Sequence, residues 1–221
     1  MIHCQSLQWG PPRLPLTPPL NLDLAPGSLT AVIGANGCGK SSLLKVLAGL
    51  QKPLAGRVRV ELRTREIGYL VQQQALDRQF PISLGELVGA GFWNSRLPTA
   101  ARREKLREAL AEWHLEGLEQ RPLAALSGGQ LQRALLARLG LMDSPLLLLD
   151  EPDACLDEAG QELLWKRIAA WHEEGRTLLL VCHDLARVRE NVPDCLRLSA
   201  EGCQHGSSHK LIARRDLAWV A

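Results

Sequence analysis

The architecture follows from one motif, Gly34-Ala35-Asn36-Gly37-Cys38-Gly39-Lys40-Ser41. It fits the pattern G-x-x-x-x-G-K-[ST] and stands between the apolar run 29–33 and a predicted helix from Ser41 to Leu50. Backbone N–H groups of such a loop converge on a phosphate at the positive end of the helix, and glycines let the backbone approach closely. We expect Lys40 to reach the β- and γ-phosphate oxygens and Ser41 to ligate Mg²⁺. A glycine-rich turn without function is the alternative.

Composition limits the class of protein. The chain has 221 residues, of which 46% are hydrophobic, enough for one large domain with a buried core. Its net charge of +2 predicts no dense basic face, so we expect no nucleic-acid partner. The N-terminus lacks the features of a secretory signal, and no apolar run reaches the length of about eighteen residues that a membrane span needs. We therefore expect a cytoplasmic protein whose six cysteines are reduced thiols.

The first part of the chain predicts a small β layer. Residues 1–28 combine short apolar strings with six prolines, a composition that allows edge strands and turns but no helix. A buried strand is expected at Leu29–Ile33. Two more strands are expected at Val58–Leu62 and Ile67–Val71, because apolar residues dominate both runs.

The character of the sequence changes between Gln72 and Leu126, where a glycine-rich patch precedes a charged segment. Apolar residues of this segment fall at helical spacing, namely Leu106, Ala109, Leu110 and Trp113. The pattern predicts an inserted helical lobe.

From Gly128 onward, helical and strand patterns alternate. A helix is predicted from Gly128 to Leu139, a buried strand at Pro145–Leu149, a second helix from Glu158 that ends at Gly175, and another buried strand at Thr177–Cys182. Alternation of this kind predicts an α/β fold with a mainly parallel sheet, whose ligands gather at the C-terminal ends of the strands.

Two adjacent carboxylates, Asp150 and Glu151, end the apolar run 146–149. The topology places them at the same sheet edge as the phosphate loop. There Asp150 can hold Mg²⁺, and Glu151 can orient or deprotonate the attacking water. A polar turn is the alternative, which the presence of the phosphate loop disfavours.

A second glycine motif, Leu126-Ser127-Gly128-Gly129-Gln130, opens the helix that begins at Gly128. A serine hydroxyl, two glycine N–H groups and a positive helix end suit a second phosphate contact. Ser127 followed three residues later by Gln130 also fits a capping box. The capping box explains the start of the helix but not the pair of glycines.

These motifs, in this order, resemble the ATP-binding cassette (ABC) family over nearly the whole chain. The resemblance implies a P-loop NTPase fold with a mainly parallel sheet core, an antiparallel β layer and an inserted α-helical lobe at about residues 83–140. All of this would form a single nucleotide-binding domain spanning residues 1–221. The implied activity is ATP hydrolysis with ATP and Mg²⁺ as ligands.

The resemblance also implies individual roles. Gln72 matches a glutamine that senses magnesium and contacts a membrane partner, although Gln73 and Gln74 leave the register open by one residue. His183 matches the histidine that contacts the γ-phosphate, and 154–157 resembles a loop that crosses a dimer interface. Trp9 aligns with an aromatic residue that stacks on adenine, while packing within the β layer is the alternative.

The predicted site therefore has three sets of residues. The catalytic set is Glu151, His183 and Gln72, and the Mg²⁺ set is Ser41, Gln72 and Asp150. The nucleotide-binding set is Trp9, Gly34, Asn36, Gly37, Cys38, Gly39, Lys40, Ser41, Ser42, Ser127, Gly128, Gly129 and Gln130.

In the family, the phosphate loop of one cassette faces the Ser-Gly-Gly of another, with ATP between them. The resemblance thus implies a homodimer with two-fold symmetry. It further implies two transmembrane permease subunits, a substrate-binding protein and a peripheral position on the inner face of the cell membrane.

The substrate is suggested by Phe80-Pro81-Ile82, followed by Val88 and Gly91. This pattern resembles cassettes of zinc, manganese or iron importers. Cassettes that serve iron-siderophore or haem importers are the alternative. Both groups often have an arginine where Phe92 and Trp93 follow Gly91 here.

Two other classes are disfavoured. A soluble cassette that acts on DNA or ribosomes would need paired cassettes, coiled-coil arms or basic surfaces, and a regulatory cassette without turnover would have lost motif residues.

The C-terminal residues Cys195, Cys203, His205 and His209 match no standard zinc spacing. A plain strand pair is expected there rather than a metal sensor.

Overall fold

The computed structural model describes residues 1–71 and 77–213 and contains a six-stranded sheet at its centre. Five strands are parallel and β9 is antiparallel to β8. Across the sheet the strands are β5 (Ile67–Leu70), β6 (Leu146–Asp150), β7 (Thr177–Val181), β3 (Leu29–Gly34), β8 (Asp194–Leu198) and β9 (Cys203–Ser207). The antiparallel pair β8–β9 contains Cys195, Cys203 and His205, where a plain strand pair was expected. Within the described ranges, no three His, Cys, Asp or Glu side chains gather as a metal site.

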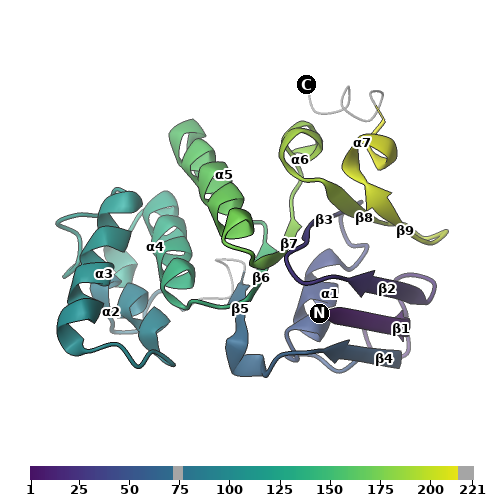
Figure 1. Ribbon diagram of the computed structural model, residues 1–221, viewed down its shortest axis with the longest axis horizontal. Helices are drawn as coiled ribbons and strands as arrows, with labels where there is room; N and C mark the ends of the chain where they lie inside the picture. The colour runs from purple at the N-terminus through teal and green to yellow at the C-terminus, as the bar shows by residue number, and fades with distance from the viewer. Residues whose placement is uncertain (72–76, 214–221) are drawn as a thin grey trace.

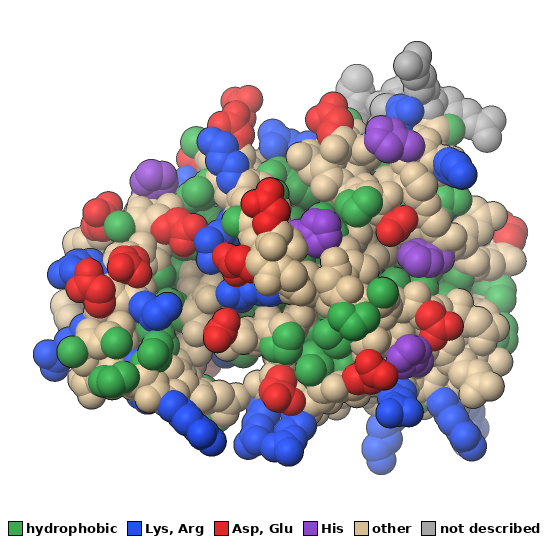
Figure 2. Space-filling view, in the orientation of Figure 1, with side chains coloured by type: hydrophobic (Ala, Val, Ile, Leu, Met, Phe, Trp, Pro, Cys, Tyr) green, Lys and Arg blue, Asp and Glu red, His purple; other side chains and the backbone are tan. Residues whose placement is uncertain are grey.

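The N-terminal β layer is a separate three-stranded sheet with the order β2-β1-β4. Its strands are β1 (Ile2–Gln8), β2 (Leu20–Leu24) and β4 (Ala55–Val60). The strand expected at 58–62 starts earlier and ends earlier, because its pairing with β1 runs from Ala55 opposite Gln8 to Val60 opposite Ile2. Basic side chains gather along the rim of the molecule where β4 lies (Figure 2), and β4 itself carries Arg57 and Arg59. Such charges discourage pairing with another edge strand.

Some of the helices flank the central sheet, and others belong to the inserted segment. They are α1 (Lys40–Leu47), α2 (Leu84–Gly89), α3 (Thr99–Glu112), α4 (Gly128–Leu141), α5 (Glu158–Glu173), α6 (Leu185–Asn191) and α7 (Ser208–Leu211), with short 3₁₀ turns η1 (Thr64–Glu66), η3 (Ala90–Phe92) and η4 (Leu123–Ala125). Helix α1 ends before the expected Leu50 because Gly49 adopts a positive φ of 74°. Gly175, at φ 82°, ends α5 as predicted.

Helices α2, α3 and α4 stand together at one end of the molecule, and the β layer lies at the other (Figure 1). The expected apolar face of α3 is confirmed, since Ala109, Leu110 and Trp113 are buried and Leu106 packs against the same core. These helices arise from the segment inserted between β5 and β6.

Hydrophobic cores lie on both faces of the central sheet, which explains why its strands are apolar throughout. In β3, Ala31 and Ile33 face the core beneath the helices, whereas Val32 faces the core shared with α1 and the β layer. The expected fold class is confirmed: an α/β P-loop fold with a mainly parallel sheet, an antiparallel β layer and inserted helices.

Candidate active site

The predicted functional residues meet at one edge of the central sheet. Strands β6, β7 and β3 are neighbours and run parallel, so the segments that follow them leave the sheet side by side. These segments carry Glu151, His183 and the phosphate loop 34–39 respectively. The sheet thus brings together residues more than one hundred positions apart in the sequence.

The phosphate loop is held by Lys40. This side chain is 6% exposed, and its Nζ donates to the carbonyl oxygens of Gly34 at 2.9 Å and Ala35 at 3.1 Å. Gly39 has a φ of 94°, and a Cβ there would lie 2.7 Å from both Trp9 Nε1 and Leu16 Cδ1. The loop therefore closes only with glycine at this position.

A hollow of about 920 Å³ opens beside the loop. Its wall includes His183 and the predicted nucleotide contacts Gly34, Asn36, Gly37 and Cys38. Ser41 and Ser42 lie in the first turn of α1, directly after the loop. The helix begins at Lys40, so the positive end of α1 faces the loop.

Ser41 and Asp150 have the chemistry of a Mg²⁺ site. The Ser41 hydroxyl donates to Asp150 Oδ1 at 2.9 Å, and Asp150 is 2% exposed. Burial is the main cause that raises the pKa of Asp150, and the hydroxyl and the lysines Lys40 and Lys45 oppose it. Both residues offer hard oxygen ligands, which Mg²⁺ prefers, so the pair fits this ion. Gln72, the third expected ligand, lies outside the described residues.

Glu151 and His183 form a pair across β6 and β7. His183 Nε2 lies 2.9 Å from Glu151 Oε1, and both side chains are partly exposed. The Glu151 backbone has a positive φ of 51°, while its N–H donates to the carbonyl of Val181 at 3.2 Å. A positive φ at a residue other than glycine stores backbone strain, and such strain clusters at functional sites.

The second glycine motif begins α4 with a complete capping box. Ser127 Oγ accepts from the N–H of Gln130 at 3.1 Å, and Gln130 Oε1 accepts from the N–H of Ser127 at 2.9 Å. A Cβ at Gly129 would lie 3.0 Å from the carbonyl oxygen of Cys155. The capping box does not explain the pair of glycines, Gly128 and Gly129. Packing against the loop after Glu151 accounts for Gly129.

The expectation that Trp9 stacks on adenine is wrong. Its side chain is fully buried in the core of the β layer, so neither face of the ring is open to a base. Its Nε1 donates instead to the Gly39 carbonyl at 2.8 Å. Trp9 therefore packs in the β layer, the alternative reading, and supports the end of the phosphate loop.

Sequence reasoning missed three polar residues that hold the loop after Glu151. The buried Gln132 donates from Nε2 to the Pro152 carbonyl at 2.8 Å, and Cys182 Sγ lies 3.7 Å from Asp153 Oδ2. Gln132 stands on the otherwise apolar face of α4, a signal that could have singled it out. Asp153 and Cys182 lie next to predicted site residues and carry no pattern of their own.

The predicted interface loop is anchored at its end. Asp157 caps α5 by accepting from the Gly160 N–H at 3.0 Å, and it pairs with Arg133 at 2.5 Å. These contacts hold the pKa of Asp157 below its usual value, with the Arg133 hydrogen bond as the largest cause.

A parallel sheet that places a phosphate loop beside a serine–aspartate pair defines a P-loop nucleotide-binding protein. The family model described as ABC transporter matches residues 18–154. The chain belongs to this family, and it is an ATPase of the ATP-binding cassette type.

Relatives match most of the chain. It is 33% identical to the zinc import ATP-binding protein ZnuC 2 of Aliivibrio fischeri, over 87% of this chain and 76% of that protein. It is 31% identical to the manganese transport system ATP-binding protein MntB of Listeria innocua, over 85% and 82%. Among solved structures, the chain is similar to a metal-chelate type ABC transporter in an inward-facing conformation, with a TM-score of 0.79 and 27% sequence identity. The match covers 98% of this chain and 87% of the transporter chain.

Proposed function

We propose that this chain is the ATP-hydrolysing subunit of an ABC importer for a divalent metal ion: zinc, manganese or iron. The observation that carries the proposal is the convergence of Lys40, the Ser41–Asp150 pair and the Glu151–His183 pair at one sheet edge. The substrate class rests on the similarity to zinc and manganese import proteins and on the Phe80-Pro81-Ile82 pattern.

The hydrolysis derives from these side chains. Lys40 exchanges its two carbonyl contacts for oxygens of the β- and γ-phosphates, and its charge offsets theirs. Glu151 accepts the proton of the attacking water, and His183, beside it, donates to the γ-phosphate. Ser41 and Asp150, with Gln72, would hold Mg²⁺, which supplies positive charge to the phosphate oxygens when bound.

The second half of the site comes from another copy of the chain. The backbone N–H groups and hydroxyl at Ser127–Gln130 begin a helix of fourteen residues, whose positive end suits the γ-phosphate held by the partner's loop. Two copies related by two-fold symmetry would then share two ATP molecules. ATP closes this homodimer and hydrolysis opens it.

The remaining partners are two transmembrane permease subunits and a substrate-binding protein. No helix in the described part of the chain is long and apolar enough to cross a membrane. Large apolar side chains at Phe80, Trp93 and Leu97 are exposed on the inserted segment and offer a contact surface for a permease. The chain then sits on the inner face of the membrane as one nucleotide-binding domain, residues 1–221, with its helical lobe at about 83–140.

An importer of iron-siderophore or haem is the second candidate. It is favoured by the similarity to the metal-chelate type transporter. The two candidates differ in cargo and share the ATPase chemistry.

Metal uptake in cells that carry Lys40→Ala in place of the parent chain tests the proposal. Lys52→Ala is the matched control, since Lys52 is exposed and lies outside the site. We expect selective loss of zinc, manganese or iron uptake with Lys40→Ala alone. Unchanged uptake of all three ions would overturn the metal assignment, and loss of siderophore or haem uptake instead would establish the second candidate.

A further inference from the structure

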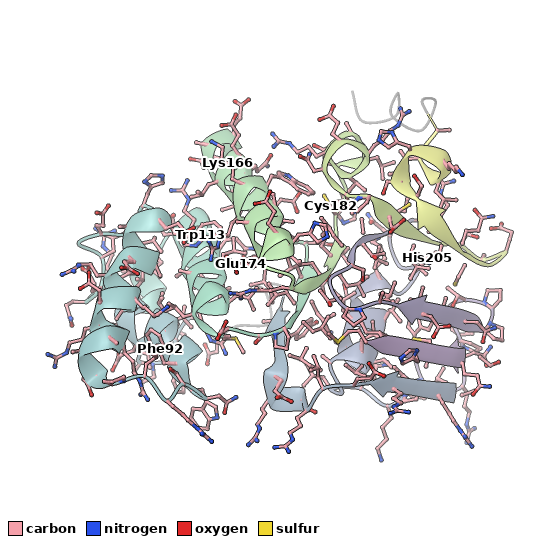
Figure 3. All side chains as sticks on the ribbon, viewed as in Figure 1. Phe92, Trp113, Lys166, Glu174, Cys182 and His205 are labelled. Atoms are coloured by element: carbon pink, nitrogen blue, oxygen red, sulfur yellow. The ribbon has the colours of Figure 1, made fainter. Side chains whose placement is uncertain are left out.

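The loops that carry Glu151 and His183 are joined by a contact outside the assigned site. Asp153 stands two residues after Glu151, and Cys182 directly precedes His183. Cys182 lies just after the last residue of β7 (Figure 3). Cys182 Sγ lies 3.7 Å from Asp153 Oδ2, within reach of a sulfur hydrogen bond. The next polar neighbour of the sulfur, the carbonyl oxygen of Asp184, is farther away at 4.0 Å.

The direction of this hydrogen bond follows from burial. Cys182 is 2% exposed, and desolvation raises the pKa of its thiol to about 12, with the charge of Asp153 adding to the effect. The thiol therefore keeps its proton near neutral pH and is the donor, while the Asp153 carboxyl oxygen is the acceptor. Burial also raises the pKa of Asp153, and the thiol hydrogen bond acts in the opposite direction.

The segment between the two carboxyl groups has little freedom. Pro152 is buried, and its carbonyl accepts from Gln132 Nε2 on α4 at 2.8 Å. The Glu151 N–H is bonded to Val181 on β7. With the Cys182 contact added, the loop is held to α4 on one side and to the end of β7 on the other, so the backbone that carries the Glu151 side chain is fixed from both sides.

We infer that the Cys182–Asp153 hydrogen bond sets the position of Glu151 against His183, which makes Asp153 and Cys182 positioning residues for hydrolysis. The inference rests on the proposed roles of Glu151 and His183. Neither positioning side chain touches the reacting atoms. Their effect is on the rate of the chemical step, since small displacements of a general base are costly.

Steady-state ATP hydrolysis by the purified full chain tests this inference. We expect Cys182→Ala and Asp153→Ala each to lower kcat about three- to tenfold, with KM for ATP changed less than about twofold. The double variant should be no slower than either single variant, because both remove the same contact. Cys182→Ser should retain most of the parent kcat, because its hydroxyl also donates.

Cys195→Ala is the matched control for lost packing. Cys195 is fully buried in the same core as Cys182 and lies on β8, away from Glu151. An equal loss of kcat in this control, additive effects in the double variant, or failure of Cys182→Ser to restore the rate would overturn the inference. Glu151→Gln tests the underlying assignment separately, because a near-normal rate in that variant would refute the role of Glu151 whatever the positioning variants do.

Discussion

Replacing Trp9 separates a packing role from a base-stacking role. Burying a tryptophan side chain removes about 150–250 Å² of accessible surface from water. At 25 cal/mol per Å², this burial stabilises the fold by about 4–6 kcal/mol. Measured losses for tryptophan or phenylalanine to alanine are about 3–5 kcal/mol. Because Trp9 is fully buried and bonded to Gly39, we expect Trp9→Ala to lower the free energy of unfolding by about 3–5 kcal/mol. Trp9→Phe keeps most of the packing and should lose about 1–2 kcal/mol.

Urea unfolding without nucleotide, followed by far-ultraviolet circular dichroism, measures both variants. Trp93→Ala is the control, since Trp93 is 89% exposed and its loss should change stability by less than about 0.5 kcal/mol. The reasoning would be refuted by a Trp9→Ala variant that unfolds at the parent midpoint but binds ATP poorly. That result would mean that the ring faces the base in solution.

Three other predictions follow from the site and its thiols. Glu151→Gln should keep ATP binding and slow hydrolysis by roughly 10² to 10⁴. An ATP-stabilised dimer should then accumulate, which size-exclusion chromatography would detect, and Glu158→Gln is a surface control. Ser127→Arg should block ATP-dependent dimerisation with little change in the nucleotide affinity of the monomer, and equal loss of monomer binding would contradict a site shared between chains. Iodoacetamide at pH 8 should label the exposed Cys155 within minutes and spare Cys4 and Cys182 in the folded chain, because burial raises the pKa of both of these thiols to about 12. Mass spectrometry of the labelled peptides would detect early modification of Cys182, which would contradict its burial.

The sequence could predict which residues meet at the C-terminal edge of the sheet, because each of them is marked by a short local pattern. A glycine loop before a helix, two carboxylates after an apolar strand and a histidine after another require only the rule that parallel strands end together. The pairs Ser41–Asp150 and Glu151–His183 follow from this rule, and the structure places their atoms within 2.9 Å.

Trp9 and Gln132 show where prediction failed. Trp9 follows the central strand of the β layer, and whether its ring faces solvent or the core depends on contacts with segments distant in the sequence, which hydrophobic periodicity does not predict. The Leu16 side chain and Trp9 Nε1 both crowd Gly39, a contact between segments over twenty residues apart. The role of Gln132 likewise depends on its hydrogen bond to Pro152, which belongs to a different segment of the chain.

The polar groups of the site are paired with one another, and this shapes how ATP can act. Lys40 bonds the loop carbonyls, Ser41 bonds Asp150, and Glu151 faces His183. Where a phosphate oxygen takes over one of these hydrogen bonds, the net gain is a difference and not the full strength of a charged hydrogen bond. Contacts from a second copy at Ser127 would add to this balance without displacing any of these pairs. In the proposed dimer, the added contacts from the second copy would supply free energy for moving His183 from Glu151 to the γ-phosphate.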